Sequence, residues 1–255
     1  MRPVPAKPIS VKGRVLGGPT PLLCVPLVGK SREDVLAEVH NLDSAAPDII
    51  ELRVDAWDCV EDHEKSASLL REARSLVDMP IILTCRGHWE GGVKEVSEAA
   101  KDAIYETGIK EKLVDFVDKE LSYEEQKLSR WKALANSNGI SLILSYHNFH
   151  RTPSKEFIYS RLAQQVRCGA DVAKAALMPE REEDVLSLLA ATLAARRDFP
   201  ETPMITMSMG PLGTHSRVVG GLYGSDLTFA VGSAASAPGQ IPVGQMRSAF
   251  KLMYG

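Results

Sequence analysis

The chain has 255 residues, 44% of them hydrophobic, so it can bury one sizeable core, and α/β barrels commonly reach this length as a single domain. Thirty basic residues against 33 acidic ones leave a formal net charge of -3 without a dense Lys/Arg block, which argues against nucleic acid as a partner. No segment approaches the roughly 20 apolar residues of a membrane span, and the N-terminal residues lack the apolar stretch of a signal peptide. We therefore expect one domain over residues 1–255, located in the cytoplasm and not in a membrane.

Short runs rich in Val, Ile, Leu and Met alternate with longer stretches of helical spacing, which is the pattern of repeated β-α units. The eight predicted strands are Leu22–Val28, Ile49–Val54, Ile81–Arg86, Val114–Leu121, Leu142–His147, Val172–Met178, Met204–Met209 and Leu227–Val231. The predicted helices are Ser31–Leu42, Glu61–Val77, Ser97–Gly108, Tyr123–Asn136, Ser154–Arg167 and Glu182–Arg197, with Ser31, Ser122 and Ser154 as N-caps. This count and rhythm predict a (β/α)8 (TIM) barrel.

Two further features bear on the fold. Residues 1–20 precede the first strand and contain Val11 and Val15 among glycines and prolines, so we expect a small β-hairpin that covers the barrel floor. An open doubly wound sheet is the alternative architecture, but no glycine fingerprint follows the first strand. The four cysteines, Cys24, Cys59, Cys85 and Cys168, are dispersed and fit no Cys-x-x-Cys pattern, so buried free thiols are favoured over disulfides or metal ligands.

Charged residues interrupt the predicted strands near their C-terminal ends. Strands of a parallel barrel are buried on both faces and are expected to be apolar, so each charge needs a reason. The period of two places Glu51, Arg53 and Asp55 on one face of their strand, and this charged face must look into the barrel mouth. The same parity turns inward Thr84 and Arg86, Ser145 and His147, and Val172, Lys174 and Ala176. Taken singly, such charges could form a structural ion-pair network, but convergence at the mouth favours a functional site.

Lys174 lies within an apolar strand, where its amine cannot reach solvent. It could pair with Glu51 or Glu120, yet desolvation beside Arg53 and Arg86 would favour the neutral amine that a Schiff base requires. His147 could be a core histidine, but at the end of a strand opposite Lys174 it becomes a candidate general base or acid.

Three loop segments complete the predicted mouth. Glu90 follows the third strand and could orient His147 or be an ordinary loop acid. The small residues of 232–241, after the eighth strand, are typical of a loop that folds over a ligand or of a plain linker. Arg217 follows the seventh strand near a predicted helix N-terminus, where it could bind a carboxylate or phosphate or could be solvated at the surface.

Several motifs together resemble one known family, the type I 3-dehydroquinate dehydratases, and the resemblance spans essentially the whole chain. They are Glu51-Leu52-Arg53-Val54-Asp55, Thr84-Cys85-Arg86 with Glu90-Gly91-Gly92, Ser145-Tyr146-His147-Asn148-Phe149-His150 with Thr152-Pro153, Gly169-Ala170-Asp171 with Lys174 and Met178-Pro179, Met207-Ser208-Met209-Gly210 with Ser216-Arg217, and Ser236-Ala237-Pro238-Gly239-Gln240.

The resemblance implies a lyase of the shikimate pathway, which supplies aromatic amino acids. Lys174 would condense with the C3 ketone of 3-dehydroquinate, and His147, oriented by Glu90, would remove the C2 proton and protonate the departing C1 hydroxyl, giving 3-dehydroshikimate and water by syn elimination. Arg217 would bind the substrate carboxylate, Ser236 and Gln240 would close over it, and the ring hydroxyls would be held by Glu51, Arg53 and Arg86. Phe149 and Met207 would form an apolar wall. The resemblance further implies no cofactor or metal and a homodimer.

Four positions depart from the common family pattern: Pro26, where serine is usual; Ala173, where proline is usual; Asn148, where Asp is frequent; and Gly221, often acidic. Two other functions remain as alternatives. A class I aldolase would use the same lysine to cleave a carbon–carbon bond, and a non-catalytic barrel would only bind a metabolite. The intact set of Lys174, His147 and Glu90 argues against the second alternative.

Overall fold

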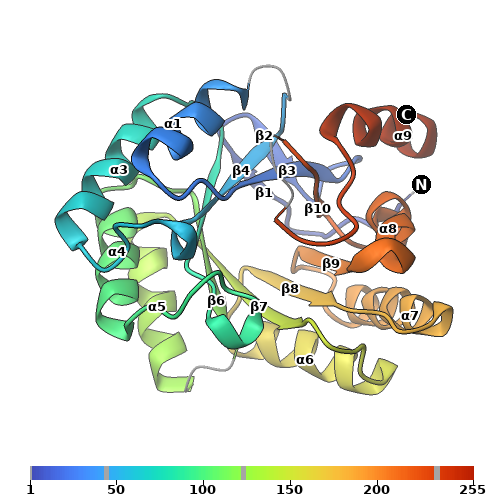
Figure 1. Cartoon of the computed structure of the whole chain (residues 1–255). Helices are drawn as coiled ribbons and strands as arrows, with labels where there is room; N and C mark the ends of the chain where they lie inside the picture. The colour runs from blue at the N-terminus through green and yellow to red at the C-terminus, as the bar shows by residue number, and fades with distance from the viewer. Residues whose placement is uncertain (1, 43–45, 122–124, 233–235) are drawn as a thin grey trace.

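The computed structural model describes residues 2–42, 46–121, 125–232 and 236–255, and its centre is a parallel barrel (Figure 1). Every predicted run forms a strand of one eight-stranded sheet, in the order β10-β3-β4-β5-β6-β7-β8-β9. The strands are β3 (Leu22–Leu27), β4 (Ile49–Arg53), β5 (Ile81–Thr84), β6 (Phe116–Glu120), β7 (Ser141–Asn148), β8 (Val172–Leu177), β9 (Met204–Ser208) and β10 (Leu227–Phe229). The predicted barrel is therefore confirmed.

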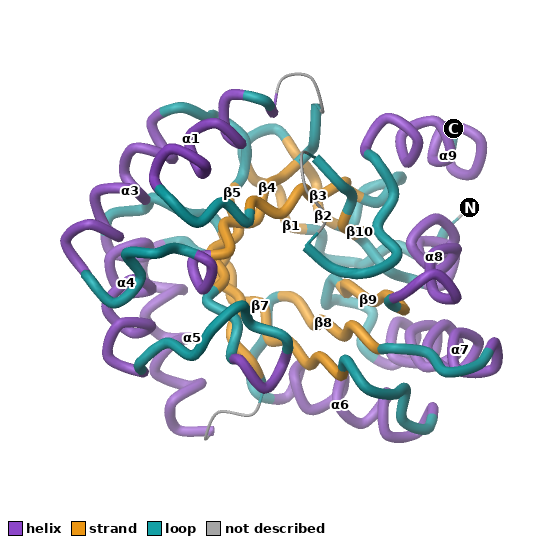
Figure 2. Tube along the Cα trace, in the orientation of Figure 1, coloured by secondary structure: helices purple, strands orange, loops and turns teal. Residues whose placement is uncertain are grey.

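Helices surround the strands on the outside of the barrel (Figure 2). They are α1 (Arg32–His40), α3 (His63–Ser75), α4 (Glu98–Lys110), α5 (Glu125–Asn138), α6 (Lys155–Arg167), α7 (Glu182–Asp198), α8 (Gly210–Val219) and α9 (Val243–Tyr254). The side chains of Ser31 and Ser154 cap α1 and α6 as predicted, whereas Ser122 and Tyr123 lie outside the described residues. Sequence periodicity did not delimit α8 and α9. Within the described part of the chain, no helix is long and apolar enough to cross a membrane.

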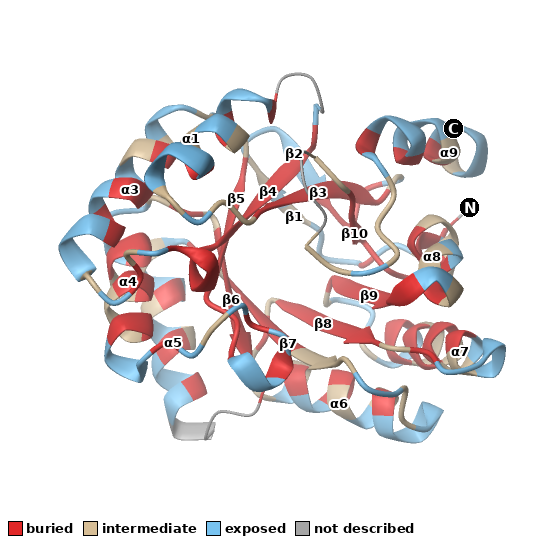
Figure 3. Ribbon diagram, in the orientation of Figure 1, coloured by how far each residue is buried: buried red, intermediate tan, exposed pale blue. Residues whose placement is uncertain are grey.

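The barrel interior is built in layers of inward-facing side chains. Near the floor, every strand turns an apolar side chain inward: Leu22, Ile49, Ile82, Phe116, Ile143, Val172, Ile205 and Leu227. Two residues further along their strands, the inward-facing side chains include Glu51, Thr84, Asp118, Ser145 and Lys174, all buried. A separate cluster of apolar residues fills the space between strands and helices, and Figure 3 shows most strand residues as buried. The predicted parity is confirmed for these residues, with an apolar floor and a polar mouth. It was wrong for Asp55: β4 ends at Arg53, and Asp55 lies in the following 3-10 turn and does not line the mouth with Glu51 and Arg53.

The floor is covered by the predicted hairpin, in which β1 (Ile9–Val11) pairs antiparallel with β2 (Arg14–Leu16). Ile9, Val11 and Leu16 pack against the apolar floor layer and separate it from solvent. Figure 1 shows the hairpin behind the barrel, beneath the strand starts.

Four aspartates at the floor share one arrangement: each immediately precedes a strand and accepts a hydrogen bond from a backbone N–H at the start of the preceding strand. Asp48 accepts from Leu23, Asp115 from Ile81, Asp171 from Leu142 and Asp226 from Met204, at 2.8–2.9 Å. Each carboxylate also pairs with a basic side chain. These aspartates therefore tie neighbouring strands together where the ladder begins.

Of the four aspartates, Asp226 is the one at the seam between β9 and β10. No strand ladder joins β9 to β10 among the described residues, and the seam between them is bridged at Asp226. Its backbone N–H donates to Met204 O at 2.6 Å and its carboxylate accepts from Met204 N at 2.8 Å. The carboxylate also contacts two buried guanidinium groups, those of Arg2 and Arg196. Asp226 thus bridges the seam through both its main chain and its side chain, and its carboxylate fixes the segment around Arg2 to the floor.

Candidate active site

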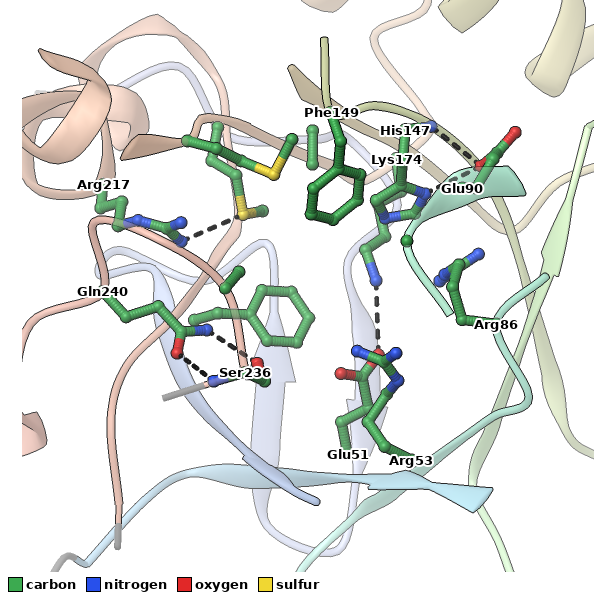
Figure 4. A pocket seen from close by; sticks show the side chains of 16 residues that line it. Glu51, Arg53, Arg86, Glu90, His147, Phe149, Lys174, Arg217, Ser236 and Gln240 are labelled. Atoms are coloured by element: carbon green, nitrogen blue, oxygen red, sulfur yellow. Dashed lines mark hydrogen bonds and ion pairs between the residues drawn. The ribbon is translucent and has the colours of Figure 1, made fainter. Parts of the chain in front are cut away.

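A pocket opens at the mouth of the barrel, and all nine predicted site residues line it (Figure 4). They are Glu51, Arg53, Arg86, Glu90, His147, Lys174, Arg217, Ser236 and Gln240. Apolar side chains complete the lining: Phe149, Ala176, Met207, Met209, Phe229 and Ala237. In Figure 4, Lys174, His147 and Glu90 lie on one side of the space, and Arg217, Ser236 and Gln240 lie on the other. The strand parity and the loop motifs therefore converge on one cavity.

Lys174 extends from β8 into the centre of the barrel and is only 3% exposed. Its Nζ donates to Asp118 Oδ2 at 2.7 Å and lies 3.5 Å from Glu51 Oε1 and 4.6 Å from the centroid of the Phe229 ring. The side chain of Gln165, from α6, bonds both the N–H and the carbonyl of Lys174 at 2.9 Å. The amine is thus aimed into the pocket by contacts on its backbone and on its head group.

Beside Lys174, His147, whose side chain is 9% exposed, pairs with the buried Glu90. Glu90 Oε2 accepts from the backbone N–H of His147 at 2.9 Å and contacts its Nδ1 at 3.0 Å. Burial, reinforced by the nearby charges of Arg86 and Lys174, lowers the pKa of His147 well below its usual value. Burial also raises the pKa of Glu90 to about 8. Burial therefore holds the imidazole neutral, and Nδ1 is the ring nitrogen that Glu90 contacts.

Asp118 is a central residue of the site that the sequence reasoning missed. Besides Lys174, it accepts from the Ser145 hydroxyl at 2.6 Å and contacts Arg86 Nη2 at 2.9 Å. Burial opposes its ionisation, but Arg86 and Lys174 outweigh that effect and lower the pKa of Asp118. The parity applied to the other strands would have found it, because Asp118 lies two residues after the inward-facing Phe116.

Glu120 was the other suggested partner of Lys174, and this suggestion was wrong. Its carboxylate instead accepts from Arg86 Nη1 at 2.9 Å and from the backbone N–H of Gly87 at 2.8 Å. Burial would lower the pKa of Arg86, but Asp118 and Glu120 raise it well above the ordinary value. Arg86 is thus a fixed cation within a network of carboxylates.

Arg217 differs from the other cations of the pocket because no carboxylate of the described residues pairs with it. Its side chain is buried, Nη1 lies 3.3 Å from the sulfur of Met207, and Nη2 donates to the carbonyl of Pro238 at 3.1 Å. Burial lowers its pKa to about 10. A buried guanidinium without a counter-ion is a ready partner for an anionic ligand group.

The loop after β10 lies over the pocket, although its residues 233–235 are outside the described part of the chain. Gln240 Oε1 accepts from Ser236 N at 3.0 Å, and Gln240 Nε2 donates to the Ser236 hydroxyl at 3.0 Å. The carbonyl of Pro238 accepts from Gly210 N at 3.1 Å as well as from Arg217. This loop is thereby joined to the N-terminus of α8.

The four departures from the family pattern have distinct local settings. Pro26 lies in β3 beside Glu51, in an inward register, and Ala173 faces the helical layer. Asn148 Oδ1 accepts from the N–H groups of His150 and Arg151, as an Asp carboxylate also could. A Cβ at Gly221 would lie 2.5 Å from Pro21 and 2.7 Å from the Tyr254 hydroxyl, so this fold has no room there for an acidic side chain.

Comparisons of the sequence and of the structure with known proteins find the same family. A family model described as type I 3-dehydroquinase matches residues 23–255. The chain is 40% identical to a 3-dehydroquinate dehydratase of Geobacillus thermodenitrificans over 247 residues, covering 96% of this chain and 95% of the relative. It is 39% identical to one of Klebsiella pneumoniae over 246 residues, covering 96% and 98%. The solved 3-dehydroquinate dehydratase of Geobacillus kaustophilus superposes with a TM-score of 0.93 at 37% identity, covering 99% and 98% of the two chains.

Fold and site together define an enzyme of the (β/α)8-barrel class with a buried lysine and a partly buried histidine at the barrel mouth. The match of the family model over residues 23–255 and the identity to full-length relatives narrow this class further. The chain belongs to the type I 3-dehydroquinase family.

Proposed function

We propose that this chain is a 3-dehydroquinate dehydratase, a hydro-lyase that converts 3-dehydroquinate to 3-dehydroshikimate and water through a Schiff base on Lys174. The observation that carries the proposal is a buried amine that shares one pocket with an imidazole kept neutral by burial. A relative from Clostridium difficile, 37% identical with a TM-score of 0.92, was solved with covalently modified comenic acid. Family membership favours this reaction over the aldolase and non-catalytic alternatives.

The chemistry divides into two proton transfers at one base. The amine of Lys174 adds to C3, and the carbonyl oxygen leaves as water, which gives a cationic iminium that attracts electrons from C2. His147 removes a C2 proton, and the electron pair of that C–H bond forms an enamine. The enamine then expels the C1 hydroxyl, which takes the proton from His147 and leaves as water. Hydrolysis of the conjugated iminium releases 3-dehydroshikimate and restores the amine.

The pocket offers a complementary group for each part of this substrate. Arg217, which no carboxylate of the described residues neutralises, binds the substrate carboxylate, and Ser236 and Gln240 close over it. Glu51, Arg53 and Arg86 line the opposite wall and hold the ring hydroxyls. Phe149 and Met207 exclude water from the reacting carbons. Glu90 orients His147 through the bond to Nδ1.

The direct test is to trap the Schiff base with borohydride in the presence of 3-dehydroquinate and to map the modified peptide by mass spectrometry. We expect the adduct on Lys174 and, without borohydride, ultraviolet absorbance from the conjugated product. A suitable control is Lys119, which is 1% exposed, lies outside the pocket, and has a pKa lowered to about 8 by burial. Lys119→Met is expected to retain trapping, whereas Lys174→Met is expected to lose it. An adduct on another lysine would disprove the mechanism.

We propose further that the whole chain acts as one catalytic domain, in the cytoplasm, as a homodimer that needs no nucleic acid, cofactor or metal. The resemblance to the family supports the dimer, and several apolar side chains at the floor are exposed, among them Val4, Val15, Leu222 and Met253. Sedimentation equilibrium tests the proposed homodimer, because a monomer at micromolar concentration would contradict it.

A further inference from the structure

Residues 87–92 form a tight loop whose two ends are joined by one buried carboxylate. Asp55, which is 0% exposed, lies in the 3-10 turn after β4 and does not line the pocket among the described residues. Its Oδ1 accepts from the backbone N–H of Arg86 at 3.1 Å, and its Oδ2 accepts from that of Val93 at 3.0 Å. Arg86 and Val93 immediately flank the loop, so the carboxylate fixes the distance between its ends.

The same carboxylate also holds a residue of the pocket. Arg53 donates to Asp55 through Nε at 2.9 Å and through Nη2 at 2.8 Å, in a bidentate pair. Asp55 therefore orients the Arg53 guanidinium through its side chain and the loop through two backbone amides.

Glu90 is carried by this loop, and the loop has little freedom to compensate for a change at its ends. Gly87 O accepts from Glu90 N and from Gly92 N, both at 3.0 Å, so the turn folds back on itself. Gly91 has φ +83°, and a Cβ there would lie 2.2 Å from the Phe149 ring. The loop thus packs directly against the pocket wall, and its ends determine where the Glu90 carboxylate meets His147.

We propose that Asp55 is a positioning residue of this enzyme: by closing the loop that carries Glu90, it sets the orientation of His147, and by its bidentate pair it separately sets Arg53. The proposal rests on the proposed function, in which Glu90 orients the base. Its two actions affect different steps, because His147 transfers protons whereas Arg53 binds substrate.

A double-mutant cycle separates these two actions. We would measure kcat and KM for 3-dehydroquinate in the wild type, Asp55→Asn, Glu90→Ala and the double variant. Asp55→Asn is expected to lower kcat about tenfold when Glu90 is present and less than about twofold when Glu90 is absent. KM is expected to rise by a similar factor in both backgrounds, because Arg53 is loosened in each. An equal loss of kcat in both backgrounds, or no loss in either, would overturn the proposal.

Asp115→Asn is the matched control, because Asp115 also accepts from a backbone N–H of the barrel, that of Ile81 at 2.9 Å, but at the floor. We expect it to leave kcat unchanged in both backgrounds. If Asp55→Asn fails to fold, Val93→Pro removes one loop-end N–H and leaves the Arg53 pair intact. It is expected to lower kcat without raising KM, whereas Val93→Ala, which keeps the N–H, changes neither. Unchanged kcat in Val93→Pro would count against the proposal, whereas a wild type inactive on 3-dehydroquinate would instead refute the proposed function.

Discussion

The floor and the mouth of the barrel both bury carboxylates, but the two ends use them differently. At the floor, Asp48, Asp115, Asp171 and Asp226 each pair with a basic side chain and with a backbone N–H of a neighbouring strand. At the mouth, Asp118 shares its charge among groups that face the pocket, and Arg217 pairs with no carboxylate of the described residues. The floor thus satisfies its charges internally, whereas the mouth leaves a charge available to a ligand.

The largest effect is expected from removing the nucleophile at the mouth. Lys174→Met should reduce turnover of 3-dehydroquinate by at least about a thousandfold, because among the described residues Lys174 is the one lysine that lines the pocket. Product absorbance measures the loss, and circular dichroism checks that the barrel is intact. Turnover within tenfold of the wild type would show that the reaction does not need this amine.

A smaller loss is expected from removing the base. His147→Ala should lower kcat by about a hundredfold to a thousandfold, within the usual contribution of a positioned acid or base. Borohydride should still trap substrate on Lys174, although more slowly. Unchanged turnover would mean that His147 is a structural histidine.

For a floor residue we expect a loss of stability with little loss of activity. Asp226→Asn leaves the buried Arg2 and Arg196 without their carboxylate and weakens the seam between β9 and β10, so we expect the free energy of unfolding to fall by about 3–5 kcal/mol. Urea denaturation measures this change. At 25 °C kcat should stay within about twofold of the wild type, and a large loss of kcat in fully folded protein would contradict the division between floor and mouth.

The smallest expected effect is on the pH dependence of the free energy of unfolding. Burial raises the pKa of Glu90 to about 8, above its value of about 4.3 in an unfolded chain. The folded state therefore keeps a proton that the unfolded state loses, and stability falls as the pH rises through this window. Gln cannot ionise, so Glu90→Gln should gain stability relative to the wild type between about pH 5 and pH 8. Melting temperatures across this range test the sign, and a constant difference would argue against a raised pKa.

The sequence predicted the functional residues at the barrel mouth better than the structural aspartates at the floor. Charges such as Glu51 and Lys174 stand out within apolar strands, and the period of two shows where they point. The floor aspartates precede the strands and look like ordinary loop residues, because their partners are backbone N–H groups that become neighbours only in the folded chain. The period of two misplaced Asp55 for a related reason, because the strand ends at Arg53 and the backbone N–H groups of Arg86 and Val93 bind its carboxylate. Helix α9 was missed although its buried residues, Val243, Met246 and Phe250, follow helical spacing.

The contact between Arg2 and Asp226 spans 224 residues of sequence, and β3 likewise finds one of its two neighbours only in β10. A ribosome makes about 5–20 residues per second, so roughly 10 to 45 seconds pass between synthesis of the two halves of this contact. During that interval the edge of β3 has no partner from its own chain, and an open edge invites pairing with other chains. The nascent chain is therefore most prone to aggregate just before β10 is synthesised.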